Sequence, residues 1–239
     1  GVKYKKWKFN KSLSLEIHDL KKIITNKTRV IFLVNPNLPI EFEFNDKLKK
    51  EIYKMCIKKN IILAYDEAYY HFGSKTEIKN AITKKNIIVM RTFSKAWGLP
   101  SIRLGFLITN KKLCEYISKC RSLVETNALS YQIAMWALSN KKILNNHVSQ
   151  IKSGSKFIHK NLKKLNIFFR GGKVTNAVLI KLNSKKEAVN LRVHMRKKKI
   201  YIRGNFKEKI ENYIRISLGP VNKMKIFIKA FDNWLKIKK

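Results

Sequence analysis

The stretch Arg91–Phe106, RTFSKAWGLPSIRLGF, places one lysine of a lysine-rich chain in a distinctive setting. Ser94 supplies a hydroxyl directly before Lys95, and Gly98 allows the chain to bend after it. Arg103 follows eight residues after Lys95, at the head of an apolar run. An amine, a hydroxyl and a guanidinium can therefore converge on one small anion. This pattern predicts a lysine that anchors a cofactor.

Strand and helix patterns alternate around this stretch. Short apolar runs predict strands over residues 29–34, 61–65, 86–90 and 102–108. Helical spacing of apolar residues predicts helices over 46–60 and 111–122. The alternation predicts an α/β fold with a mainly parallel sheet covered by helices. Pro36, Asp66 and the Ser94–Lys95 loop follow predicted strand ends, where open α/β sheets build ligand sites.

The pattern changes in the C-terminal part of the chain. Helices are predicted over residues 130–138, 147–165, 186–199 and 221–236. Strands are predicted over residues 167–170, 178–182, 200–203 and 213–218. We therefore expect a partial large domain over residues 1–146. Residues 147–239 are expected to form a bridging helix and a small α+β domain.

The formal net charge of +38 would ordinarily indicate a nucleic-acid partner. However, 44 lysines against 9 arginines, with 30 isoleucines and 22 asparagines, are typical of a protein from an AT-rich genome. The lysines are also spread along the whole chain rather than gathered in one stripe. We therefore expect no nucleic-acid binding.

Cysteine and histidine spacing gives no metal-binding pattern. Cys56, Cys114 and Cys120 form no Cys-x-x-Cys pair, and the five histidines are dispersed. The apolar runs are far shorter than the ~20 residues that span a bilayer, and Gly1 begins no hydrophobic targeting segment. We expect a cytoplasmic protein without a metal ion and without a membrane partner.

Four separated segments match one known family in order. They are Asn35–Glu41 (NPNLPIE), Asp66–Phe72 (DEAYYHF), the segment around Lys95, and Tyr213–Gly219 (YIRISLG). Together they resemble fold-type I pyridoxal-phosphate-dependent aminotransferases (class I/II), within them the histidinol-phosphate aminotransferase-like branch. The family's N-terminal arm and first strands would lie upstream of Gly1. We therefore expect the chain to lack the N-terminal part of the family's chain.

The resemblance implies three catalytic residues and pyridoxal 5'-phosphate as cofactor. Lys95 would hold the cofactor aldehyde covalently and then act as a base; the alternative is one more surface lysine. Asp66 would keep the pyridine nitrogen protonated, or would simply cap a turn. Tyr69 would donate its hydroxyl to the phenolate oxygen of the ring, or would be an amphipathic aromatic at the sheet edge.

Five further residues would bind the cofactor or the substrate. Thr92, Ser94 and Arg103 would hold the cofactor phosphate through hydroxyl and guanidinium groups. Arg215 stands alone on an apolar predicted strand, so it should meet a substrate carboxylate or phosphate, or else a structural carboxylate. Arg203 is a second candidate for binding a substrate anion.

The first segment departs from the family pattern. Leu38 stands where the family has an asparagine that hydrogen-bonds the phenolate oxygen, and Ile40–Glu41 replaces Thr-Gly. Either Tyr69 makes the phenolate contact alone in a divergent subfamily, or the protein is decaying as an enzyme. Because Lys95, Asp66 and both arginines, Arg103 and Arg215, are all present, we favour divergence.

 The resemblance implies an aminotransferase that would move an amino group between an amino acid or amino-alcohol phosphate and a 2-oxo acid, and that would act as a homodimer. A decarboxylase of a phosphorylated amino acid would use the same residues, and a catalytically inactive basic binding protein could keep the same fold. The sequence leaves these alternatives open.

Overall fold

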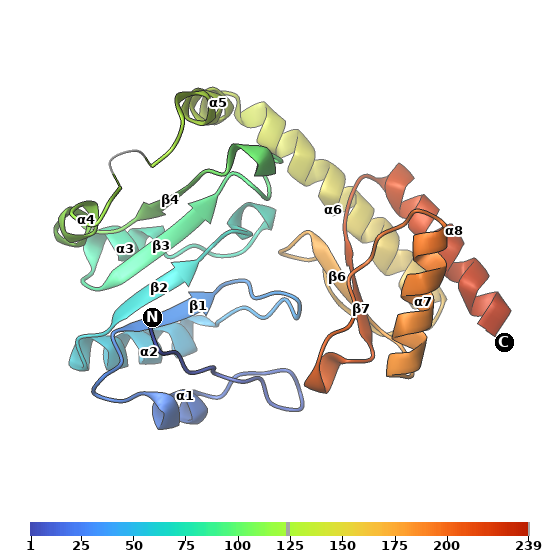
Figure 1. Ribbon diagram of the computed structural model, residues 1–239, viewed down its shortest axis with the longest axis horizontal. Helices are drawn as coiled ribbons and strands as arrows, with labels where there is room; N and C mark the ends of the chain where they lie inside the picture. The colour runs from blue at the N-terminus through green and yellow to red at the C-terminus, as the bar shows by residue number, and fades with distance from the viewer. Residues whose placement is uncertain (123–124, 239) are drawn as a thin grey trace.

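The computed structural model describes residues 1–122 and 125–238 and contains two sheets (Figure 1). The large sheet has the strand order β1-β2-β3-β4. Its strands are β1 (Val30–Val34), β2 (Ile62–Asp66), β3 (Ile87–Thr92) and β4 (Gly105–Ile108). The first three strands are parallel, and β4 pairs antiparallel with β3. The predicted α/β fold with a mainly parallel sheet is therefore confirmed.

Helices and short 3-10 turns precede, connect and follow the strands of the large sheet. They are α1 (Ile17–Ile23), α2 (Asp46–Lys58), η1 (Tyr70–Phe72), α3 (Ile78–Thr83), η2 (Pro100–Ile102) and α4 (Lys111–Ser118). The side chain of Asn45 accepts a hydrogen bond from the amide of Leu48, which caps the start of α2. Ile52 and Cys56 of α2 are fully buried and pack with alternate residues of the strands. This packing fixes one face of the large sheet.

Two helices lead from the large sheet to the small one. They are α5 (Ala128–Ser139) and the long α6 (Lys141–Lys164), which runs diagonally from beside α5 toward the small sheet in Figure 1. The small sheet has the order β5-β6-β7 and is antiparallel. Its strands are β5 (Phe169–Gly171), β6 (Ala177–Lys181) and β7 (Tyr213–Ser217). The remaining elements are α7 (Lys185–Lys197), η3 (Glu208–Ile210) and α8 (Val221–Lys238).

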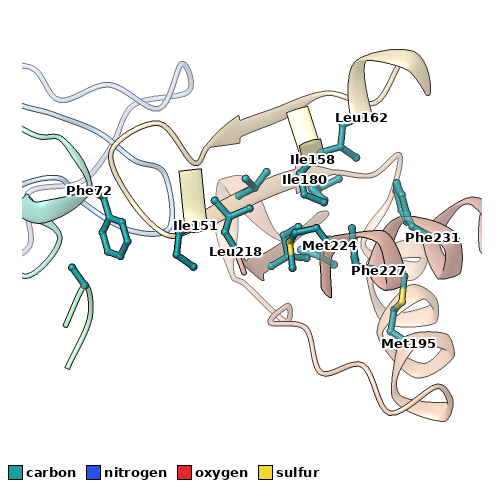
Figure 2. Close-up of a cluster of buried hydrophobic side chains, with 14 of the residues drawn as sticks. Phe72, Ile151, Ile158, Leu162, Ile180, Met195, Leu218, Met224, Phe227 and Phe231 are labelled. Carbon is teal, nitrogen blue, oxygen red and sulfur yellow. The ribbon is translucent and has the colours of Figure 1, made fainter. Parts of the chain in front are cut away.

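One buried cluster joins the small sheet, α6, α7 and α8 to the loops of the large sheet. Figure 2 shows Phe72 of η1 beside Ile151 of α6, at one end of the cluster. Phe227 and Phe231 of α8 stack at the other end, with ring centroids 5.6 Å apart. The two sheets therefore share apolar packing through α6.

The helix α6 approaches the chain after β7 very closely. A Cβ built on Gly154 of α6 would lie 1.8 Å from the carbonyl oxygen of Gly219. Real side-chain carbons do not approach an oxygen so closely, so only glycine fits at position 154. This contact sets how deeply α6 packs against the start of α8.

Two expected strands differ from the structure. Residues 200–203 form no strand, because within them only Arg203 pairs with the small sheet, through a single bridge to Arg215. The strand expected from residue 102 begins at Gly105, since Arg103 adopts the left-handed conformation after η2. The long helix also begins at Lys141 rather than at residue 147. Among the described residues, no helix is both long and apolar enough to cross a membrane.

Candidate active site

The candidate site lies at the carboxyl edge of the parallel strands. Asp66 is the last residue of β2 and is paired in register with Val34 and Met90. Its Oδ1 accepts a hydrogen bond of 2.9 Å from the amide of Ala68, so one carboxylate oxygen caps the turn after the strand. Asp66 is half-buried. Asp66 therefore caps the turn, as the alternative interpretation of this residue predicts, and this cap uses only the Oδ1 atom of its carboxylate.

Lys95 and Tyr69 lie next to each other. The Nζ atom of Lys95 is 5.6 Å from the centroid of the Tyr69 ring, within the range of a cation–π contact. Tyr69 follows β2 and Lys95 follows β3, so the parallel strands bring the two residues together. Both side chains are half-buried. An amine and a phenol thus lie side by side at the sheet edge.

Backbone and hydroxyl contacts hold the loop that carries Lys95. Thr92 Oγ1 accepts a hydrogen bond of 3.0 Å from the Ser94 amide, and the Gly98 amide donates to the Lys95 carbonyl at 3.1 Å. Gly98 has a φ of 68°, a conformation that glycine adopts without strain. The Thr92 hydroxyl thus shapes the loop in this structure.

Arg103 is exposed and lies in the turn between η2 and β4. Its Nη1 donates a hydrogen bond of 2.9 Å to the carbonyl of Pro100. Its backbone is left-handed, with a φ of 51°. The side chain is therefore partly committed to its own turn. Binding of a phosphate by Ser94 and Arg103 stays a prediction.

Arg203 and Arg215 face each other across two adjacent backbone segments. The amide of each donates to the carbonyl of the other, at 2.9 and 2.7 Å. The Nε of Arg215 is buried without a hydrogen-bond partner. Burying a donor of a charged group without a partner is costly, so the buried Nε of Arg215 favours an anion as its partner. The structure thus pairs the two arginines that the sequence proposed for anion binding.

A buried ion pair behind the site was missed by the sequence analysis. Glu67 is 1% exposed, and its Oε2 accepts from the Nη2 of Arg91 at 2.9 Å and from the Thr76 hydroxyl at 2.8 Å. Its Oε1 accepts from the amide of Glu77 at 2.6 Å. The Arg91 guanidinium also lies 3.7 Å from the centroid of the Tyr70 ring. This network fixes the segments that carry Asp66 and Lys95.

The only signal for this network in the sequence is that two charged residues lie next to predicted strand ends. A second buried pair continues it, because Lys49 Nζ lies 2.9 Å from Glu77 Oε1. Burial, together with the nearby Arg91 charge, lowers the pKa of His71 below its ordinary value of 6.5. His71 therefore stays neutral at neutral pH beside the site.

The turn after β1 is also held by a buried polar contact. Asn35 Oδ1 accepts a hydrogen bond of 3.0 Å from the amide of Phe44, while Asn35 Nδ2 is buried without a partner. Leu38 is half-buried in the same turn. The turn therefore brings an apolar side chain where the family pattern has an amide.

The fold places the chain in a known structural class. A putative histidinol-phosphate aminotransferase from Erwinia carotovora atroseptica superposes with a TM-score of 0.84 at 20% identity, over 96% of this chain and 67% of that protein. A histidinol-phosphate aminotransferase from Sinorhizobium meliloti, solved in complex with pyridoxal-5'-phosphate, has a TM-score of 0.77 at 22% identity, over 88% and 58%. These similarities show a fold-type I fold.

The sequence comparison assigns the family. The model of aminotransferase class I and II matches residues 1–231, so the chain belongs to this family. The histidinol-phosphate aminotransferase of Methanocaldococcus jannaschii is 26% identical over 235 residues, which are 97% of this chain and 62% of that protein. The chain thus spans about three fifths of the length of the curated relatives it matches, with shares of 62%, 60% and 62% for three of them.

Proposed function

We propose that this protein is a pyridoxal-phosphate-dependent aminotransferase that transfers an amino group between histidinol phosphate, or a related amino-alcohol phosphate or amino acid, and a 2-oxo acid. The contact between Lys95 and Tyr69 at the sheet edge, beside Asp66, is the observation that carries this proposal. The family match and the names of the curated relatives support it.

The side chains at the site fit the proposed cofactor. An amine, a phenol, a carboxylate and a hydroxyl meet the needs of its aldehyde, phenolate oxygen, ring nitrogen and phosphate. When bound, pyridoxal phosphate supplies an aromatic ring that accepts electrons from the substrate carbon. We assign Lys95 the covalent attachment, with Ser94, Thr92 and Arg103 at the phosphate.

Each residue then has a distinct task. The Asp66 carboxylate would keep a proton on the ring nitrogen, and the Tyr69 hydroxyl would donate to the phenolate oxygen. The Lys95 amine would move a proton at the substrate carbon. Arg215, with Arg203 beside it, binds the carboxylate or phosphate of the substrate, which would give its buried Nε a partner.

The alternatives receive less support. The curated relatives are named histidinol-phosphate aminotransferases, so a decarboxylase of a phosphorylated amino acid is not favoured. An inactive basic binding protein is not favoured either, because the lysine, aspartate and tyrosine stay clustered. A homodimer, a cytoplasmic location, the absence of nucleic-acid binding and the domain division at residue 146 stay predictions.

Covalent trapping of the cofactor tests this proposal. The purified protein is incubated with pyridoxal phosphate, reduced with borohydride and digested, and the labelled peptide is identified by mass spectrometry. We expect the label on Lys95, its loss in Lys95→Ala, and no change in Lys79→Ala, an exposed lysine on α3. A label that persists in Lys95→Ala would move the anchor to another lysine and refute the assigned site.

A further inference from the structure

The carboxylate of Glu41 binds the backbone of a loop that is distant in the sequence. Its two carboxylate oxygens accept hydrogen bonds from three successive backbone amides: Gly172 at 2.8 Å, Lys173 at 2.9 Å and Val174 at 3.3 Å. The Thr175 hydroxyl adds a bond of 2.5 Å. Successive amides that point at one anion form a backbone nest. Glu41 thus fills an anion-binding concavity in the Gly171–Thr175 loop.

This contact joins segments that are more than 130 residues apart. Glu41 lies in the turn after β1, whereas the nest lies between β5 and β6. In Figure 1 the loop that precedes β6 reaches from the small sheet toward the large one. The helix α6 holds the loop from its other side, because the Ser155 hydroxyl donates to the carbonyl of Gly172 at 2.5 Å.

The backbone conformation of Glu41 depends on this contact. Its φ is 57°, a left-handed conformation that is sterically unfavourable for a glutamate. The family pattern has glycine here, which adopts this conformation without that cost. The hydrogen bonds of the carboxylate offset the strain, so the side chain and the backbone geometry support each other.

We propose that Glu41 is a positioning residue that ties the small sheet to the turn at the edge of the large sheet. The nest loop leads directly into β6, where Leu179 is paired in register with Arg215. Holding the loop therefore holds Arg215 relative to Lys95. This inference rests on the proposed function, since it assigns Glu41 the placement of the substrate-binding arginine over the reacting site.

Glu41→Asn tests this role, because asparagine tolerates the left-handed conformation but is one methylene shorter and carries no charge. Glu43→Gln is the matched control: Glu43 is exposed, lies two residues away and changes the net charge equally. Hydrogen exchange is followed in the turn around residues 35–42 and in the loop around residues 171–175. The KM, the kcat and the visible absorption of the bound cofactor are measured with histidinol phosphate and 2-oxoglutarate.

In Glu41→Asn we expect faster exchange in both segments and a KM for histidinol phosphate that rises about tenfold, with kcat and cofactor absorption nearly unchanged. Added formate is the decisive reagent. It can fill the nest and restore protection of the loop, but it cannot tie the loop to the turn. We therefore expect the turn to keep exchanging fast and KM to stay high. Glu43→Gln should behave like the unaltered protein.

Two results would overturn the inference. If formate restores KM and the protection of both segments, Glu41 only caps the loop. If exchange and KM are both unchanged in Glu41→Asn, the contact positions nothing. Should the unaltered protein bind no cofactor, the proposed function fails, while the exchange of the two segments still decides whether Glu41 ties them together.

Discussion

Removing the charge of Glu67 should destabilise the protein strongly. The Glu67 side chain is 0% exposed and that of Arg91 is 10% exposed, so Glu67→Gln leaves a buried guanidinium without its counter-charge. Its four hydrogen bonds, two from Arg91 and one each from Thr76 and the Glu77 amide, lose their charged acceptor. Breaking a buried pair by removing one partner costs about 3 to 5 kcal/mol.

Urea unfolding followed by circular dichroism measures this loss. With an m value of roughly 3 kcal/mol/M, the midpoint should fall by about 1 to 1.7 M. Glu115→Gln, on the exposed face of α4, serves as the control and should stay within about 0.5 kcal/mol of the unaltered protein. The double variant Glu67→Gln/Arg91→Met should cost less than the sum of the single variants by at least about 1 kcal/mol.

Additive effects of the two substitutions, or a loss below about 1 kcal/mol for Glu67→Gln, would refute this reasoning. Either result would mean that the pair is solvated in solution and that it does not hold the segments behind the site.

Three further predictions concern packing, thiol reactivity and pH. Gly154→Ala should lower the free energy of unfolding by at least about 1 to 3 kcal/mol in urea titrations, because the new Cβ meets the Gly219 carbonyl; a stabilised variant would contradict the close approach. Burial raises the pKa of the Cys56 thiol to about 12, so a thiol reagent should modify the two exposed cysteines in the native protein and Cys56 only after denaturation. Rapid modification of all three cysteines in the native protein would contradict this. Burial lowers the pKa of His159 below its ordinary value of 6.5, so the unfolded chain takes up this proton first as the pH falls. The stability that the neutral ring contributes above pH 6.5 is therefore lost as the pH falls through the lowered pKa. His159→Gln should lose less stability than the unaltered protein between about pH 7.5 and pH 5.5, and equal losses would contradict this.

Much of the fold could be predicted because it depends on local pattern. The apolar runs that end at Asp66 and before the lysine loop are strands in the structure, and their parallel pairing brings Tyr69 and Lys95 together. Residues 200–203 have an equally apolar pattern and form no strand, since only Arg203 bridges to β7. Strand pairing depends on the partner segment, which a local pattern does not contain.

The supporting contacts of the site could not be predicted for the same reason. Glu67 and Arg91 are 24 residues apart, and Glu41 is 131 residues from Gly172. Nothing in either local sequence specifies its partner. The left-handed backbone of Arg103 likewise follows from how the loop closes, which the local sequence does not specify.

The buried carboxylates have a consequence for the whole surface. Acidic residues number only 15 against 53 basic ones, and Glu67 and Glu77 are enclosed with Arg91 and Lys49 as their partners. Few negative charges remain on the surface to balance the lysines, so the exposed lysines of the folded chain repel one another. Ions in the solvent screen exposed charges but barely reach enclosed ones. Raising the ionic strength should therefore favour the compact state, because it weakens the repulsion and leaves the internal pairs in place.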